Sequence, residues 1–143
     1  MKKKLMGALV DSVLCLAACN STEHKVRQNA ERYIKAMAEY DFKGARPFAT
    51  PETQHTTLDF IESNIMPTVD TAFVRQNTPA KITIDSVVFT SDTAARVHFR
   101  KSTPIQTNTP ATVEMRLRDG EWLAHQMVDF TVKMGTKHNK QTK

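Results

Sequence analysis

The sequence predicts an α+β domain in which N-terminal helices pack on a curved four-stranded antiparallel sheet. Apolar residues recur every three or four positions up to about residue 76, which is typical of helices. From Lys81 onward they alternate with polar residues, which is typical of strands. Short turn sequences separate most of the alternating runs, so neighbouring strands are expected to pair antiparallel, with helices covering one face of the sheet.

The strongest local signal is a hairpin over residues 112–132. Asp119-Gly120 lies between two runs of alternating side chains, which indicates a two-residue β-turn. On the first arm Val113 faces the same side as Met115 and Leu117. The predicted apolar face of the second arm consists of Trp122, Ala124, Val128 and Phe130, with Gln126 as a polar exception. This apolar face needs a cover, which the helices can supply.

Three helical segments are expected before the strands. Residues 26–40 carry apolar side chains at three- and four-residue spacing. Asp41 is placed to cap a short second helix. Thr50 followed by Pro51 is a clearer start signal, because a capping hydroxyl precedes a proline at the first helical position. Pro67 is expected to end or kink the third helix.

Two further strands and a loop are expected between the helices and the hairpin. Residues 81–89 alternate, with a bulge near Ser86, and residues 95–100 alternate after a turn. Residues 104–110 are polar, carry a proline at each end, and are expected to form a loop. With the two arms of the hairpin, these strands make a four-stranded meander.

The amino terminus has the layout of a secretory signal peptide, because three lysines precede a short apolar run within residues 1–18. The run ends in Leu-Ala-Ala-Cys, which resembles the bacterial lipobox, whose cysteine is acylated and becomes the first mature residue. Cys19 is therefore the expected lipid-attachment site, with residues 19–23 as a tether. The alternative is a buried helix of a cytoplasmic protein, but the lysine cluster and the polar residues that follow favour the signal peptide.

Cysteine content and charge exclude several classes of protein. Cys15 would leave with the signal peptide and Cys19 would carry lipid, so the mature domain would have no disulfide and no nucleophilic thiol. The formal charge is +5, and removal of residues 1–18 leaves +3. The tail, residues 133–143, carries lysines and no acid, so the folded middle is close to neutral and no nucleic-acid partner is indicated.

Several motifs, taken in order, resemble the nuclear-transport-factor-two-like (cystatin-like) superfamily over residues 24–132. They are Asp-Phe-Lys-Gly-Ala at 41–45, Thr-Pro-Glu at 50–52 and Asp-Gly-Glu-Trp at 119–122. More narrowly, the chain is similar to a domain of unknown function found in small bacterial lipoproteins and related to lumazine-binding-protein-like domains. The resemblance implies a sheet that curves around the first helix as a cone. Some members are isomerases or dehydratases that use an Asp and a His or Tyr inside the cone, and that Asp has no clear match here.

Tyr33, Trp122 and Gln126 are the candidate pocket residues. If the apolar sheet face packs on the first helix, the Gln126 amide lies among apolar side chains and needs a hydrogen-bond partner, which the Tyr33 hydroxyl can supply. The pair is either a polar group satisfied locally or a polar spot in a ligand pocket. Because no carboxyl or imidazole group falls on that face, no catalytic residue is expected.

No cofactor and no metal are expected. The five histidines lack metal-binding spacing, and His98 and His125 are placed two strands apart on the polar face of the sheet. The predicted function is a non-catalytic ligand- or protein-binding module of the bacterial cell envelope, held to a membrane by its acyl anchor and either periplasmic or surface-exposed. Its expected partner is a small molecule or an envelope protein, and a homodimer through the sheet face is a further option. The alternative is a small-molecule enzyme, of the isomerase or dehydratase kind or a hydrolase, acting inside the cone.

Overall fold

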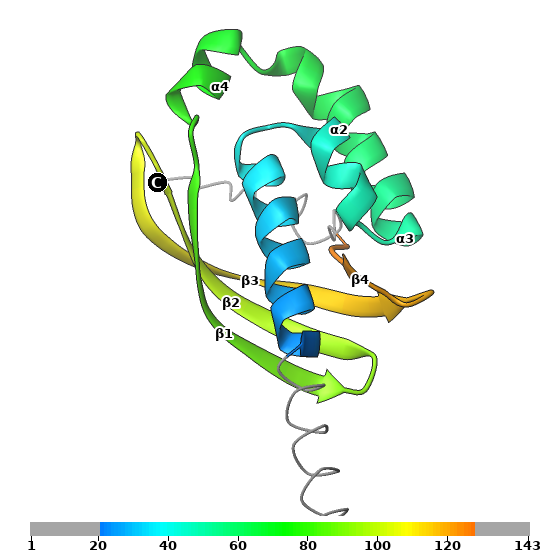
Figure 1. The fold of residues 1–143 in the computed structure, drawn as a ribbon. Coiled ribbons are helices and arrows are strands. Elements are labelled where there is room, and N and C mark those ends of the chain that lie inside the picture. The colour runs from blue at the N-terminus through cyan, green and yellow to red at the C-terminus, as the bar shows by residue number, and fades with distance from the viewer. Residues whose placement is uncertain (1–20, 128–143) are drawn as a thin grey trace, which may run out of the picture.

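The computed structural model describes residues 21–127, which form a group of helices on one side of an antiparallel sheet (Figure 1). This confirms the predicted α+β class. The first helix runs from residue 21, where the described range begins, to residue 38. Residues 21–23, expected to be part of the tether, therefore belong to this helix, and Glu23 pairs with Arg27 at 3.1 Å. Cys19, the signal segment and the residues after Met127 lie outside the described range.

A series of short helical segments follows the first helix. They are α2 (Phe42–Ala45), η1 (Arg46–Phe48), α3 (Pro51–Thr53), η2 (Gln54–Leu58), η3 (Ile61–Ile65), η4 (Met66–Thr68) and α4 (Thr71–Gln76). The two predicted caps are confirmed: Asp41 accepts from the Gly44 N–H, and Thr50 accepts from the Thr53 N–H. Because η2 and η3 are π-helical turns, residues 51–65 form one widened helix, which ends in the turn that carries Pro67.

The sheet is a meander with strand order β1-β2-β3-β4. Its strands are β1 (Lys81–Ser91), β2 (Ala94–Thr103), β3 (Gln106–Arg118) and β4 (Glu121–Ala124). The predicted bulge near Ser86 is confirmed by a register shift between Ile84 and Ser86. In the predicted hairpin turn, Asp119 and Gly120 have φ values of 50° and 80°. Positive values at both positions are what the favoured two-residue turn requires.

The loop expected over residues 104–110 is wrong. A tight turn at residues 104–105 leads directly into β3, which pairs with β2 from Gln106 onward. Residues 106–112 are exposed, and the short β4 does not reach them, so among residues 21–127 this end of β3 pairs with β2 alone. Polar side chains suit an exposed edge, and Pro110 is tolerated because its missing N–H is not needed there.

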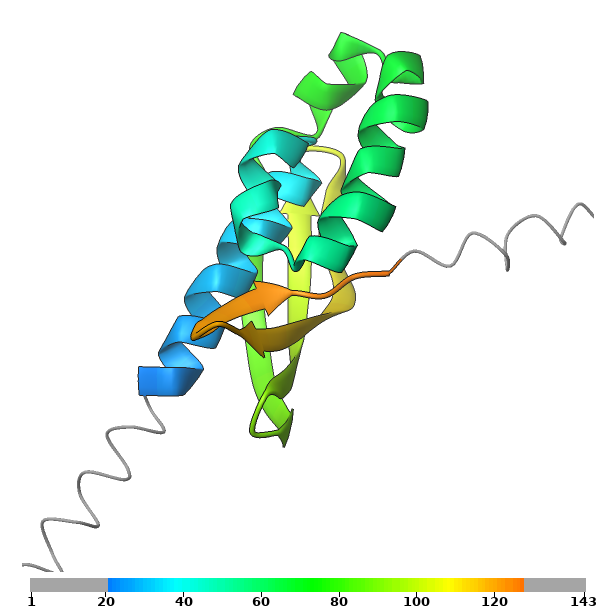
Figure 2. The same cartoon turned by 90° about the vertical axis from the view of Figure 1, so that its right-hand side faces the viewer.

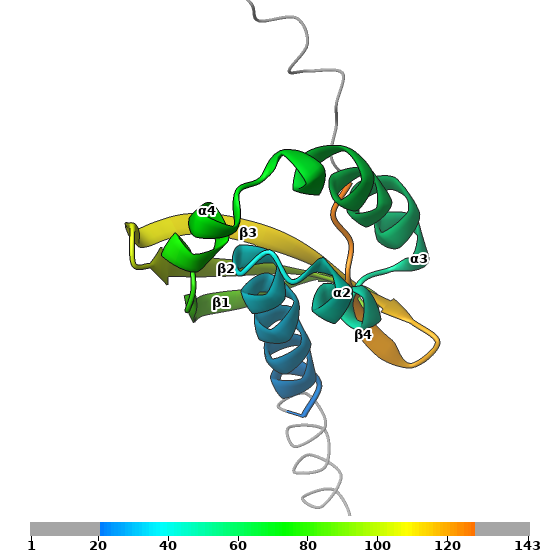
Figure 3. The same cartoon turned by 90° about the horizontal axis from the view of Figure 1, so that it is seen from above.

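The core lies between the inner face of the sheet and the helices, which sit on one side of the strands (Figures 1 and 3). Val113 and Trp122 both belong to it, at 5% and 4% exposure, so the predicted apolar face of the hairpin is confirmed as far as Ala124, while Val128 and Phe130 lie outside the described residues. The first helix is also fastened to β4, which runs beside it in Figure 2: the Asn29 side-chain amide donates to the Trp122 carbonyl at 3.0 Å. Within residues 21–127, no helix has the length and apolar character needed to span a bilayer.

Candidate functional site

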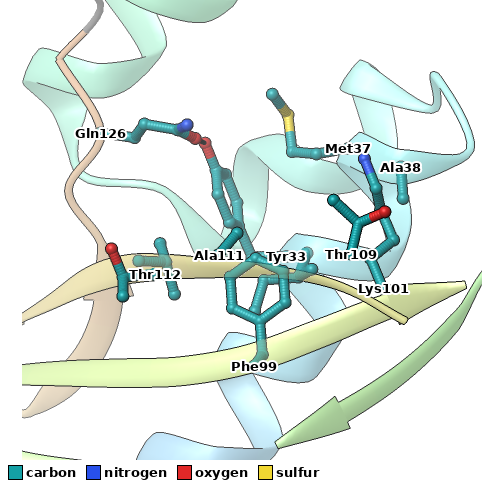
Figure 4. Close-up of a pocket in the computed structure, with 11 residues that line it drawn as sticks. Tyr33, Met37, Ala38, Phe99, Lys101, Thr109, Ala111, Thr112 and Gln126 are labelled. Atoms are coloured by element: carbon teal, nitrogen blue, oxygen red, sulfur yellow. Dashed lines mark hydrogen bonds between the residues drawn. The ribbon is translucent and has the colours of Figure 1, made fainter. Parts of the chain in front are cut away.

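A pocket of about 240 Å³ lies between the first helix, β2 and β3 (Figure 4). The first helix contributes residues that lie one turn apart and therefore share a face. The strands contribute side chains from the end of β2 and from the part of β3 that pairs with it. Its lining consists of Tyr33, Ile34, Met37, Ala38, Phe99, Lys101, Thr109, Ala111, Thr112, Val113 and Gln126. Most of these side chains are apolar, so the pocket offers mainly van der Waals contact and a few polar groups.

Tyr33 and Gln126 meet at this pocket. The Tyr33 hydroxyl donates to Gln126 Oε1 at 2.7 Å, and Tyr33 is only 1% exposed. Burial raises the pKa of Tyr33 far above its usual range, which keeps the hydroxyl neutral and able to donate. Gln126 itself is exposed, so its expected burial is wrong: it lies two residues beyond the end of β4.

Trp122 lies elsewhere. Its ring is in the core and makes an edge-to-face contact with Phe89, with ring centroids 5.8 Å apart. On its other side it lines a separate hollow with Asn29 and Phe48. The structure therefore brings two of the three candidate residues together and places the third apart from them.

Sequence reasoning missed a row of three buried threonines, which holds the chain at Gln126. Thr50, Thr53 and Thr57 are each 0% exposed: Thr50 caps the widened helix, and the other two follow it at three- and four-residue spacing within the helix. The Thr50 N–H donates to the Ala124 carbonyl at 2.9 Å. The Gln126 N–H donates to Thr53 Oγ1 at 3.0 Å, and the Thr57 hydroxyl donates to the Gln126 carbonyl at 2.6 Å.

These threonines give the chain from Ala124 to Gln126 the hydrogen-bond partners that a neighbouring strand would otherwise supply. The available signal was their spacing of three and four residues, which puts small hydroxyl side chains on one helical face. Their partners lie about seventy residues away in sequence and were not visible from the pattern.

A second, polar hollow lies across β2 and β3, on the face opposite the core. His98 and His125 both line it, and His125 is half-buried because its Nδ1 also lies 3.0 Å from Oγ1 of the buried Thr50. Glu114 lies between two arginines, at 3.3 Å from Arg96 and 3.4 Å from Arg116. Burial raises the pKa of Glu114 and the two arginines lower it, with a net result below its usual range. In residues 21–127, no group of three or more His, Cys, Asp or Glu side chains is placed to hold a metal ion.

The chemistry that the Tyr33–Gln126 pocket offers is limited. Among the described residues that line it, Tyr33 and Lys101 are the titratable groups, and neither a carboxyl nor an imidazole is present. A proton-transfer mechanism needs an acid or base within hydrogen-bond reach of the reacting group, with a pKa near the working pH. The elevated pKa of Tyr33 makes it a poor base at neutral pH. The arrangement can orient a small ligand through hydrogen bonds.

No protein-family model matches the sequence, and no curated protein matches it. Solved structures share its fold. A Campylobacter jejuni protein, provisionally described as an NTF2-like transpeptidase, is 15% identical, with a TM-score of 0.50 over 70% of this chain and 96% of that one. An NTF-2 like protein of unknown function from Shewanella oneidensis is 17% identical, with a TM-score of 0.48 over 73% of this chain and 98% of that one. The chain thus has the NTF2-like, cystatin-like fold that the sequence predicted.

Proposed function

We propose that this chain is a lipid-anchored protein of the bacterial cell envelope whose cone binds a small molecule without transforming it. The observation that carries the binding role is the pocket beside the Tyr33–Gln126 hydrogen bond. Its floor is formed by the paired strands β2 and β3, and its wall is a helix fastened to β4 through Asn29. Such a pre-formed concave site with few polar groups is the usual form of a ligand pocket.

The size and polarity of the pocket define the class of ligand. At about 240 Å³ the pocket is smaller than the range of roughly 300–1,000 Å³ that is common for ligand sites, so its occupant is small. Gln126 and Lys101 lie at opposite ends of the pocket (Figure 4). The Gln126 amide nitrogen can donate at one end and the Lys101 ammonium at the other. A small molecule with an apolar body and an anionic or strongly accepting group fits this arrangement.

The absence of a carboxyl or imidazole among the described lining residues supports binding over catalysis. The alternative is an isomerase- or dehydratase-like enzyme, or a hydrolase, acting inside the cone. The two are separated by recovering the bound molecule from protein purified in its native membrane and incubating it with fresh protein. Binding without catalysis predicts that the molecule returns unchanged, whereas a converted product would overturn the non-catalytic role.

A protein partner is the second candidate. Ile65, Phe73 and Ile105 are each at least 40% exposed and line one groove at the far end of the first helix. Exposed apolar side chains gathered in this way are typical of interaction surfaces. An envelope protein that docks there would be captured by a photo-cross-linking residue placed at Ile105 in intact cells, and Phe73→Asp would abolish the cross-link. The homodimer through the sheet face stays a prediction, to be checked by the mass of the purified protein in solution.

The anchor is supported by the sequence around Cys19, which lies outside the described residues. The expected result is that a fatty-acid probe labels the wild-type protein in cells and does not label Cys19→Ala. Cys15→Ala is the matched control, because it removes the other thiol and should keep the label. Labelling of Cys19→Ala at the wild-type level would contradict the lipid anchor.

A further inference from the structure

The polar hollow across β2 and β3 is rich in hydrogen-bond donors. Its volume of about 610 Å³ lies within the range of roughly 300–1,000 Å³ that is common for ligand sites. Its charged and titratable lining residues are Arg96, His98, Glu114, Arg116 and His125. With both histidines neutral, the two guanidinium groups outweigh the carboxylate by one positive charge. The hollow is therefore suited to an anion.

The strand register gathers these side chains on one face of the sheet. Arg96 pairs with Glu114, and His98 pairs with Thr112, across β2 and β3. Residues directly opposite each other on antiparallel strands share a face, and so do residues two apart on one strand. Arg116 therefore lies on the same face as Glu114. The paired backbone of the two strands fixes where these side chains start.

Glu114 satisfies the two arginines only in part. Its carboxylate oxygens lie 3.3 Å from Arg96 Nη2 and 3.4 Å from Arg116 Nη2, longer than the 2.7–2.9 Å that is typical of a charge-assisted hydrogen bond. A guanidinium group carries five N–H donors, and among residues 21–127 each of these two arginines makes a single hydrogen bond. Arg100, on the same face of β2, instead makes three hydrogen bonds to Asp85 at 2.9–3.1 Å.

Arg116 also carries an unpaired donor. Its Nε is buried and, within the part of the chain that the structure describes, has no hydrogen-bond partner. A buried donor without an acceptor costs free energy. An anion that draws the guanidinium group toward the hollow would relieve this cost.

The buried threonines prepare His125 as a further donor. Thr50 Oγ1 lies 3.0 Å from His125 Nδ1 and 2.8 Å from Thr53 Oγ1, and it accepts from the Thr53 N–H. Because Thr53 is fully buried, its hydroxyl proton needs an acceptor, which Thr50 Oγ1 provides. Thr50 Oγ1 then has both lone pairs occupied and donates its own proton to His125 Nδ1. The neutral imidazole of His125 therefore carries its proton on Nε2, where it is a donor.

We propose that this hollow binds the oxyanion group, a carboxylate or a phosphate, of a small molecule. Arg96 and Arg116 donate to the oxyanion through the N–H groups that Glu114 leaves free, and His125 donates through Nε2. Glu114 holds the arginines in place and competes with the ligand for them, so binding is reversible. Because the hollow is much larger than an inorganic ion, the oxyanion is one group of a larger molecule. This site lies on the face opposite the cone pocket and goes beyond the proposed function.

An NMR titration of the full chain with inorganic phosphate and, separately, with succinate tests the site at constant ionic strength. Saturable shifts of the amides around the hollow are expected, with a Kd below about 10 mM for at least one anion. Arg96→Gln and Arg116→Gln should each weaken binding at least about tenfold. Arg100→Gln is the matched control and should change the affinity by less than about twofold, because Asp85 already pairs that charge. Glu114→Gln should strengthen binding at least about threefold, since the competing carboxylate is removed.

The two anions identify the chemistry of the ligand. Saturation by phosphate alone supports a phosphate group, saturation by succinate alone supports a carboxylate, and saturation by both supports the shared oxyanion chemistry. Saturation by neither would overturn the site. Equal losses in Arg96→Gln and Arg100→Gln would also overturn it, because general charge attraction would then explain the binding.

Glu114→Gln keeps the test decisive if either arginine variant fails to fold, because it predicts a gain of affinity. A loss of affinity in Glu114→Gln would contradict the competition between Glu114 and the ligand and would overturn the proposed site. The titration needs no ligand in the cone pocket, so its failure is distinct from a failure of the proposed function.

Discussion

The Tyr33 hydroxyl and the Gln126 side chain, 93 residues apart in sequence, form a 2.7 Å hydrogen bond between the first helix and the segment after β4. The bond joins the first helix to the last few described residues, and it lies at the pocket. The same contact therefore contributes to the stability of the cone and to the polarity of the candidate site. Its two partners differ in environment, because Tyr33 is buried while Gln126 reaches solvent.

Tyr33→Phe removes the donor and keeps the ring. Because the exposed Gln126 amide can turn to water, the cost is expected to be that of an ordinary hydrogen bond, about 0.5–1.5 kcal/mol in the free energy of unfolding. Urea denaturation of the two proteins measures it. Tyr40→Phe is the control, since within residues 21–127 the Tyr40 hydroxyl makes no hydrogen bond, and it should change the stability by less. A larger loss in the control than in Tyr33→Phe would contradict this assignment.

Stability at high pH should depend on Tyr33. Burial raises the pKa of its hydroxyl in the folded protein above the unfolded value of 10.0. The folded state therefore holds this proton more tightly, so its contribution to stability is constant below pH 10 and is lost as the pH rises above it. Tyr33→Phe lacks this group, and its stability should fall less than that of the wild type between about pH 8 and pH 11. Parallel pH dependence of the two proteins would exclude a buried, neutral Tyr33.

Thr53→Val tests the threonine row that holds Gln126. The substitution keeps the shape of the side chain but removes the acceptor for the Gln126 N–H and a hydrogen-bond partner of Thr50. The Gln126 N–H then lacks its acceptor, while Thr50 Oγ1 keeps His125 Nδ1 as a partner at 3.0 Å, so the expected loss is about 1–3 kcal/mol in the free energy of unfolding. Thr56→Val on the exposed side of the same helix is the control, with an expected change within about 0.5 kcal/mol. Equal effects at the two positions would show that the row is not structurally important.

The effect of Gly44→Ala on stability should change sign when Asp41 is also replaced. A Cβ atom at Gly44 would overlap the Asp41 carboxylate, which caps α2 by accepting the Gly44 N–H. Gly44→Ala should therefore destabilise the protein by displacing the cap, at a cost of about 0.5–2 kcal/mol. In an Asp41→Ala background the same substitution should stabilise it by about 0.5–1 kcal/mol, because alanine is the better helix former. A double-mutant cycle by urea denaturation measures the change of sign, and additive effects would contradict it.

The parts of the fold that the sequence predicts well are those set by neighbouring residues. The caps at Asp41 and Thr50 and the turn at Asp119-Gly120 need only a few adjacent positions to form, and all three are present. The polar residues and the two prolines of segment 104–110 indicate a loop. At the edge of a sheet neither property prevents a strand, and the pairing partner on β2 decides the outcome.

The site is less predictable, because it depends on contacts between distant segments. The apolar faces of the first helix and of the hairpin predict that Tyr33 meets Gln126, and the structure contains this hydrogen bond. The exposure of Gln126 depends on where β4 ends, which alternation alone does not indicate. Thr53 and Thr57 lie on a helix whose π-helical winding and partner segment are both set by tertiary packing.

The pocket between the first helix and β3 is expected to hold a small molecule. The most direct test is mass spectrometry of the molecules released from protein purified out of native membranes, comparing wild type, Met37→Trp and Ile105→Trp. Met37 lines the pocket, whereas Ile105 is exposed outside it. A small molecule is expected to be bound to wild type and to Ile105→Trp and to be lost from Met37→Trp. The same occupancy in all three proteins, or no bound molecule in any of them, would contradict it.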